Sequence, residues 1–417
     1  MVMTKAGLNV SRLFPKPFTT LKYPCVNLCM IDMQAMKNQR FLIFFLIIFP
    51  LPVWAQVSPV DRAATKKTRL LYTNLAEIAR QGVMFGHQDD QAYGLGWWDE
   101  KGRSDVKEVT GSYPSVHGWD LGDIGLSPFN LDTVDFTSMR KWIKAAYKRG
   151  GINTISWHLD NPKTGGSSWD QTPSVKEALP GGEAHEAYLK QLDALADFLK
   201  SCKVGFTKIP IIFRPFHEHN GNWFWWGKGN CEEQDYKALW RFTADYLKNQ
   251  RGIHHLLYAF SPDRSRLDLS QGEVSYFYGY PGDEYVDIIG LDNYWDVGHG
   301  HNKNTREQQA KHLSQSLSLI HQIAREKNKV AALTETGHSG LHETDWFTQR
   351  ILKPFKDNKD LEIAWVLVWR NRHKGHFYTP PKDHPAAGDF QSFFDDPITL
   401  FEKNLRDVYK AGFEIIE

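Results

Sequence analysis

The chain has 417 residues, of which 41% are hydrophobic, and a formal net charge of +1 at pH 7. This length and composition suffice for a globular core without metal or disulfide support, and they exclude a disordered chain. The balanced charge excludes binding to nucleic acid or anionic lipid through overall charge, so any electrostatic partner must be recognised locally. The balance of charge favours a neutral ligand. The 15 tryptophans and the 13% aromatic content fit either a ligand whose faces stack, such as a pyranose ring, or a tryptophan-rich core.

Residues 37–56 show the pattern of an export signal. A basic segment at 37–40 precedes an apolar run at 41–49, and a small-residue cleavage site follows at 53–56. The apolar run is shorter than the roughly 20 residues that a membrane-spanning helix needs. The pattern therefore predicts a cleaved signal peptide rather than a membrane span.

We expect residues 36–55 to be this signal peptide and Met36 to be the true initiator, which makes residues 1–35 an upstream extension. The exported chain would start near Gln56 and reach the periplasm of a Gram-negative host or the extracellular medium. The residue directly after the cleavage site is not a cysteine, so we expect no lipid anchor and no other membrane anchor.

Residues 56–417 show no linker, repeat or low-complexity segment and are predicted to form one domain. Short apolar runs alternate with longer amphipathic segments, which is typical of repeated βα units. Eight strands are predicted, which favours a (β/α)8 TIM barrel in the α/β class. The predicted strands are 83–86, 114–118, 152–157, 209–214, 255–260, 286–291, 330–335 and 363–369, and the clearest helices are 136–148, 184–200, 233–249 and 305–327.

The exported chain contains Cys202 and Cys231 as its only cysteines. An oxidising compartment permits a disulfide between them. The predicted barrel places Cys202 just before a strand and Cys231 just before the following helix, which are opposite ends of the barrel. We therefore expect these thiols to remain unpaired.

Polar and aromatic residues follow nearly every predicted strand, at the barrel end where active sites form. Glycoside hydrolysis needs two carboxyl groups, so acids that end buried strands are the first candidates. Glu218 follows the apolar run 209–213, and Glu335 closes the run 330–333. Acids elsewhere lie mostly in helical or loop contexts, where a solvated surface position is the default. The sequence therefore indicates Glu218 and Glu335 as the catalytic pair.

The segment 214–227, Arg-Pro-Phe-His-Glu-His-Asn-Gly-Asn-Trp-Phe-Trp-Trp-Gly, resembles the acid/base motif of glycoside hydrolase family 26, whose best-known members are β-1,4-mannanases. Further segments resemble that family in the right order: 333–337 its nucleophile segment, 290–295 its strand-6 motif, 156–158 its strand-3 motif and 368–370 its strand-8 end. The resemblance implies a retaining β-glycanase with Glu218 as acid/base and Glu335 as nucleophile.

The resemblance also implies roles for other residues. His158 and His217 would line the sugar subsite at the cleavage point, and Tyr294 would hydrogen-bond the nucleophile. Trp169 and Trp223 would be aromatic platforms, and Asp292, Trp369 and Arg370 would shape the glycone side of the cleft. His219 departs from the family pattern and leaves fine specificity open.

The predicted substrate is β-1,4-mannan or manno-oligosaccharide, cleaved by a monomer without metal or other cofactor. β-1,3-Xylan and mixed-linkage β-glucan remain alternatives, as does the choice between endo action and release of mannobiose from chain ends. Two alternatives come from other functional classes. The first is a barrel metallohydrolase, whose metal site would use His217-Glu218-His219 with His158, His117 and Asp292. The second is a non-catalytic carbohydrate-binding protein that uses the aromatic cleft.

Overall fold

The computed structural model describes residues 57–416. The predicted upstream extension and signal peptide lie outside these residues. Within the described part, no helix combines the length and apolar character that crossing a bilayer requires. Cys202 is buried, Cys231 is partly buried, and both are free thiols.

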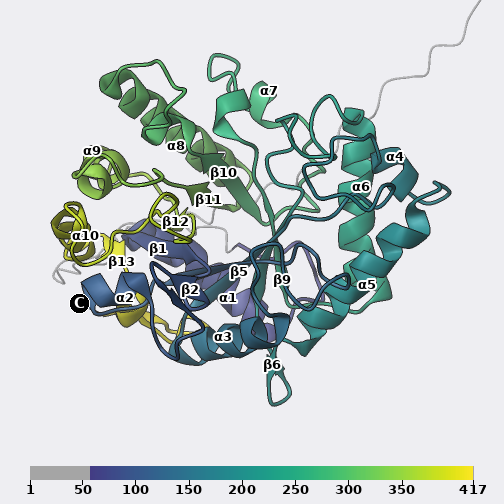
Figure 1. The fold of residues 1–417 in the computed structure, drawn as a ribbon, viewed down its shortest axis with the longest axis horizontal. Coiled ribbons are helices and arrows are strands. Elements are labelled where there is room, and N and C mark those ends of the chain that lie inside the picture. Colours follow the sequence, from purple (N-terminus) through teal and green to yellow (C-terminus); the bar gives the residue numbers. More distant parts are fainter. Residues whose placement is uncertain (1–56, 417) are drawn as a thin grey trace, which may run out of the picture. The chain divides into compact units, whose positions relative to one another are not determined.

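Eight parallel strands pair in sequence order, and the last pairs with the first to close a barrel (Figure 1). The closing register sets Met84 opposite Trp365 and His87 opposite Val368. The (β/α)8 prediction is thus confirmed, with strand ends shifted by a few residues. The barrel strands are β1 (Val83–Gln88), β4 (Val116–Asp120), β5 (Ile152–Trp157), β8 (Ile211–Pro215), β9 (Leu256–Phe260), β10 (Ile288–Asn293), β11 (Val330–Thr336) and β12 (Trp365–Val368).

Helices surround the barrel, and the four clearest predicted helices are all present (Figure 1). The predicted helix 233–249 ends its α-helical part at Asp245 and continues as a π-helical segment, Tyr246–Gln250. The helices are α1 (Lys66–Gln81), α2 (Asp105–Thr110), α3 (Phe136–Arg149), α4 (Val175–Ala178), α5 (His185–Ser201), α6 (Glu233–Asp245), α7 (Glu273–Tyr276), α8 (Arg306–Glu326), α9 (Lys353–Asp357) and α10 (Ala387–Phe394).

Short strands extend the loops and the C-terminal segment. β13 (Thr399–Leu400) pairs in parallel with the start of β1, and the other short strands form antiparallel pairs. These pairs are β2 (Tyr93–Gly94) with β3 (Trp97–Trp98), β6 (Lys203–Val204) with β7 (Thr207–Lys208), and β14 (Leu405–Arg406) with β15 (Glu414–Ile415).

Alternation along the strands divides the core into two parts. On β1, Val83 and Phe85 belong to the cluster that also contains the large outer helices, whereas Met84 belongs to a second cluster with inward residues of the other strands. This second cluster includes Leu75 and Ile78 of α1. The barrel interior is therefore filled, and its polar strand-end residues are left to form a site at the opposite end of the strands from α1.

Candidate active site

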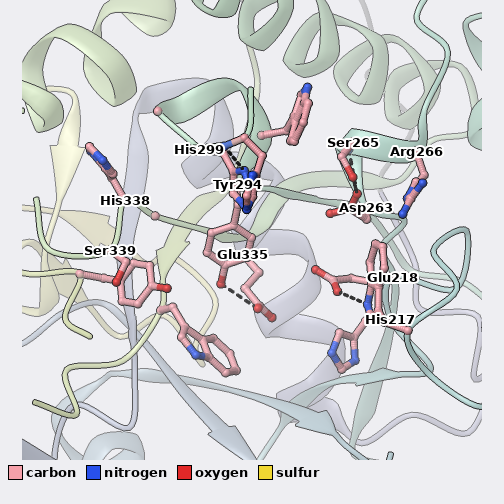
Figure 2. Close-up of a pocket in the computed structure, with 18 of the residues that line it drawn as sticks. His217, Glu218, Asp263, Ser265, Arg266, Tyr294, His299, Glu335, His338 and Ser339 are labelled. Carbon is pink, nitrogen blue, oxygen red and sulfur yellow. Dashed lines mark hydrogen bonds between the residues drawn. The ribbon is translucent and has the colours of Figure 1, made fainter. Parts of the chain in front are cut away.

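A cavity of about 850 Å³ opens where the barrel strands end. Figure 2 shows the carboxylates of Glu218 and Glu335 pointing toward one another across it. Eight of the ten predicted site residues line this cavity, and Asp292 and Arg370 are not among its lining. The eight are His158, Trp169, His217, Glu218, Trp223, Tyr294, Glu335 and Trp369.

Glu218 lies in a tight turn directly after β8. Its backbone has a φ of 55° and that of Phe216 a φ of 49°, so the turn holds two non-glycine residues in the left-handed region. The Glu218 amide donates to the Ser261 carbonyl at 2.8 Å, and the Trp223 indole N–H donates to Glu218 Oε2 at 2.8 Å. These contacts fix the direction of the carboxyl group.

The surroundings of Glu218 favour its protonated form. Burial raises its pKa well above the ordinary glutamate value, and the negative charges of Asp263, Asp292 and Glu335 raise it further, while Arg214 opposes them. A carboxyl group that keeps its proton near neutral pH is suited to general-acid catalysis.

Glu335 is held by donors at both of its oxygens. The Tyr294 hydroxyl donates to Oε1 at 2.8 Å, and Arg214 Nη2 forms an ion pair with Oε2. Glu335 lies in β11, where the strand register shifts between Leu333 and Thr336. An irregularity of this kind changes the direction of a side chain, so the shift accounts for Glu335 facing the cavity.

Arg214 connects Glu335 with Asp292 beneath the cavity. Arg214 Nη1 lies 2.5 Å from Asp292 Oδ2, and Thr334 donates to Asp292 Oδ1 at 2.7 Å. Burial raises the pKa of Asp292 well above its ordinary value, although the Arg214 charge opposes this. The Asp292 side chain is fully buried and pairs with Arg214, so Asp292 has no direct place in the cavity lining. That Asp292 shapes the glycone side of the cleft stays a prediction, which it would do through Arg214. No role for Arg214 was predicted from the sequence.

His158 and His217 form a pair at the cavity wall, with 3.2 Å between their Nε2 atoms. His158 also donates from Nδ1 to Asp120 Oδ2 at 2.7 Å. Burial favours a low pKa for His158, but the Asp120 carboxylate outweighs it and the pKa is raised. Burial, the Arg214 charge and His158 hold the pKa of His217 well below its ordinary value. The surroundings thus favour the protonated form of His158 and the neutral form of His217.

The aromatic side chains have unequal access to the cavity. The Trp169 ring is half-exposed and stacks on His158 at 5.3 Å between centroids. Trp223 is partly buried, and the Arg266 guanidinium lies 5.4 Å from the centroid of its ring. Trp369 contacts the edge of His158. These rings supply apolar walls of the kind that bind sugar faces.

Arg370 lies beside the cavity in a buried charged cluster. Its Nη1 is 2.5 Å from Asp132 Oδ1 and 3.3 Å from the Tyr93 hydroxyl. Burial raises the pKa of Asp132 to about 6 and that of Asp89 to about 8. Arg370 therefore forms an ion pair with Asp132 and is not among the residues that line the cavity. That Arg370 shapes the glycone side of the cleft stays a prediction.

Several residues that line the cavity from the loops after β9, β10, β11 and β12 were not predicted from the sequence. A signal was present for Asp263, which follows β9 closely and so shares the strand-end position of the predicted residues. The others stand further along the loops, where strand ends give no indication. They are Ser265, Arg266, Trp295, His299, His301, His338, Ser339, His342 and Tyr378.

The geometry does not favour a metal centre at the histidines. His219 turns away from His217, donates from Nε2 to the Tyr278 carbonyl at 2.6 Å and stacks on Tyr236. Among residues 57–416, no group of three or more histidine, cysteine, aspartate or glutamate side chains is placed to hold a metal ion.

Comparison with known proteins decides the family. The sequence model of glycosyl hydrolase family 26 matches residues 60–332. The chain belongs to glycosyl hydrolase family 26. The matched range of this family includes Glu218 and ends shortly before Glu335, so the position of Glu335 in the cavity is independent evidence for its part in the site.

Relatives in family 26 are similar over most of the barrel. A β-mannanase from Bacteroides ovatus has 40% identity and a TM-score of 0.77, covering 84% of this chain and 98% of its own. A modular endo-β-1,4-mannanase from Cellulomonas fimi has 34% identity and a TM-score of 0.77, with 85% and 80% covered. A mannan endo-1,4-β-mannosidase from Bifidobacterium adolescentis is 31% identical over 361 residues, which are 82% of this chain but only 35% of that protein.

Proposed function

We propose that this protein is a retaining β-mannanase in which Glu218 is the acid/base and Glu335 the nucleophile. The observation that carries the proposal is the contrast between two carboxyl groups facing one cavity. Burial and neighbouring carboxylates keep the proton on Glu218, whereas Glu335 receives a hydrogen bond from Tyr294 and an ion pair from Arg214. The names of the family 26 relatives support mannan as the substrate.

In the first step, a carboxylate oxygen of Glu335 attacks the anomeric carbon while Glu218 gives its proton to the departing glycosidic oxygen. A covalent glycosyl ester forms and the leaving sugar departs. In the second step, the Glu218 carboxylate removes a proton from water, which attacks the same carbon and releases Glu335. Two inversions retain the β configuration.

The aromatic walls bind the sugar rings and exclude water from the reacting bond. His158 and His217 present ring nitrogens at the same wall, where they can hydrogen-bond sugar hydroxyls. Arg214 and Tyr294 hold the Glu335 carboxylate in place during attack, so less reorganisation is needed at the moment of reaction.

Proton NMR of the first product from a mannan oligosaccharide tests the mechanism. The β-anomer should appear first, before mutarotation. Initial appearance of the α-anomer would contradict the nucleophile assignment, because a single displacement inverts the configuration.

Product profiles test the substrate and the mode of attack. The protein should act on β-1,4-mannan and mannohexaose in preference to β-1,3-xylan and mixed-linkage β-glucan. A ladder of products from polymeric mannan indicates endo action, whereas mannobiose alone from the start indicates attack at chain ends. Preference for either other glycan would overturn the substrate assignment and leave the two-glutamate mechanism standing.

We further propose that the protein is exported as a monomer after removal of residues 36–55. The signal-like pattern in the sequence supports this. N-terminal sequencing of the secreted protein should give a start near Gln56, and light scattering should give the mass of one chain. Retention of residues 1–35 in the mature protein would contradict the proposed initiator.

A further inference from the structure

The hairpin formed by β6 and β7 has an apolar tip without packing partners. Phe206 is fully exposed at the turn and Gly205, with a φ of 56°, precedes it. Lys203 and Lys208 pair across the two strands. Figure 1 shows this hairpin projecting outward beyond the neighbouring helices. A phenylalanine gains stability from burial, so a contact outside the chain that covers Phe206 would be favourable.

Basic side chains lie around the base of this hairpin. Cys202, at the base of the hairpin, has its pKa raised to about 12 by burial, and Lys144, Arg140 and Lys208 are the charges that oppose the rise. The pKa of Lys208 is in turn lowered by burial and by the positive charges of Lys203 and Lys200. Contacts place the same cations together: the Arg140 guanidinium lies 5.5 Å from the Phe198 ring centroid in α5, and Lys208 Nζ donates to the Lys200 carbonyl at 2.6 Å. Cations of α3, of the end of α5 and of the hairpin strands are thus neighbours.

Few carboxylates accompany these cations in the sequence. Segments 136–149 and 198–210 contain eight lysine or arginine residues, of which Arg149 pairs with Glu402, and no aspartate or glutamate. The acids directly before the two segments are engaged elsewhere, because Asp135 caps α3 and Asp197 pairs with Arg251. We call Phe206 together with Arg140, Lys144, Lys200, Lys203 and Lys208 the basic hairpin patch. Within the described chain, none of its five cations forms an ion pair with a carboxylate. Because the net charge of the whole chain is only +1, this group of cations is a local feature of the protein.

We propose that the basic hairpin patch binds the surface of an anionic lipid membrane, with Phe206 entering the interface and the cations facing the headgroups. An exposed aromatic tip between lysines combines the apolar and the electrostatic contributions that reversible membrane binding needs. The contact is peripheral and does not anchor the chain.

The position of the hairpin makes this contact compatible with catalysis. It joins the end of α5 to the start of β8, whereas the cavity opens where the strands end. A protein bound through the hairpin would therefore keep its cavity free for a saccharide. The inference is independent of which glycan is cleaved.

Co-sedimentation of the exported protein with vesicles tests the proposal. Vesicles of phosphatidylglycerol and phosphatidylethanolamine should retain the protein at low ionic strength, and phosphatidylcholine vesicles should not. Added salt should weaken the binding, because screening shortens the range of the attraction. Equal retention by both vesicle types would overturn the proposal. Failure of both vesicle types to retain the protein would also overturn it, and would leave a protein partner as the alternative.

Matched variants locate the contact. The double variant Lys203→Glu, Lys208→Glu should lower the partition coefficient at least about tenfold, since each basic residue near an anionic surface adds attraction. Phe206→Ser should lower it roughly fivefold, because only part of the ring enters the interface.

The controls carry the same changes elsewhere. Lys101→Glu with Lys374→Glu alters net charge equally on loops at the other end of the barrel, and Val274→Ser removes another exposed apolar side chain. All variants should keep the thermal unfolding temperature and the glycosidase activity of the parent. If the control variants lose vesicle binding as much as the hairpin variants do, the basic hairpin patch is not the contact.

Discussion

The Trp223 indole N–H donates a hydrogen bond to Oε2 of Glu218 at 2.8 Å. Trp223 therefore acts directly on the proposed acid/base, in addition to any contact that its ring makes with a sugar. A donor to a carboxylate stabilises the ionised form and lowers its pKa, so removing the donor should raise the pKa of Glu218 further. If Glu218 is the general acid, its pKa, which burial raises, should set the alkaline limit of activity.

Replacing Trp223 in two ways separates the hydrogen bond from the ring. Trp223→Phe keeps a ring and should shift the alkaline limb of the kcat/KM profile to higher pH. Trp223→Ala loses both features and should reduce kcat/KM on mannohexaose by about 1 to 3 kcal/mol with the fold intact. The pH profile and thermal unfolding check both outcomes. If Trp223→Ala unfolds far earlier while its folded fraction has unchanged kinetics, the ring is part of the core instead.

Tyr294→Phe should lower kcat with little change in stability. The substitution removes one donor from Oε1 of Glu335 and leaves Arg214 at the other oxygen. A hydrogen bond to a charged group contributes about 1.5 to 3 kcal/mol, which corresponds to a loss of roughly 10- to 100-fold. Single-turnover measurement of glycosylation checks the step. An unchanged glycosylation rate would show that Arg214 alone positions the nucleophile.

Glu218→Ala and Glu335→Ala should differ in their dependence on the leaving group. Glu218→Ala should lose roughly 10²- to 10⁴-fold on mannan, but much less in the glycosylation of an aryl mannobioside with an acidic phenol, which departs without a proton. A glycosyl-enzyme should then accumulate, and azide should speed its turnover to a β-glycosyl azide. Glu335→Ala should be nearly inactive on both substrates, and any azide rescue should give the α product.

Rates and NMR of the azide products check the two roles. The assignments are reversed if Glu335→Ala keeps substantial activity on the aryl substrate while Glu218→Ala has none. Unchanged activity in both variants would remove the catalytic interpretation altogether.

Asp120→Asn should destabilise the protein in a pH-dependent way. The pKa of His158 is raised and that of Asp120 is lowered from their ordinary values of 6.5 and 3.8. The His158 contribution is complete below pH 6.5 and disappears as pH rises through the folded-state pKa, whereas the Asp120 contribution is complete above pH 3.8 and disappears as pH falls through its own. The stability lost in Asp120→Asn should thus be largest between these limits.

Breaking such a buried pair costs about 3 to 5 kcal/mol. Denaturant unfolding of wild type and Asp120→Asn across pH measures the difference. Ser156→Ala provides a control, because it removes another partner of Asp120 without changing any charge. A difference between wild type and Asp120→Asn that does not vary with pH would show that the two side chains are not coupled through ionisation.

Chelation should leave the activity unchanged. His219 faces Tyr278 rather than His217, so the histidines after β8 do not converge on a shared ligand position. Assays with and without EDTA, combined with metal analysis of the purified protein, check this expectation. Loss of activity on chelation that added metal restores would favour the metallohydrolase alternative.

The sequence by itself determined the order of strands and helices, the barrel and the two glutamates. Apolar runs with flanking turn residues reveal strands locally, and parallel strands must present their ends on one side. Glu218 and Glu335 follow such runs, so their meeting in one cavity follows from the topology. The resemblance of the segment 214–227 to family 26 added the substrate class.

Only the tertiary structure decided what lies behind these residues. Asp292 and Arg370 were expected to shape the glycone side of the cleft, and the structure shows that each forms an ion pair with a residue far away in the sequence, Arg214 or Asp132. The position of Arg214 between Asp292 and Glu335 likewise depends on three strands meeting. The direction of a side chain at a strand end is set by strand register and by partners distant in the sequence, and neither is encoded in local hydrophobic periodicity.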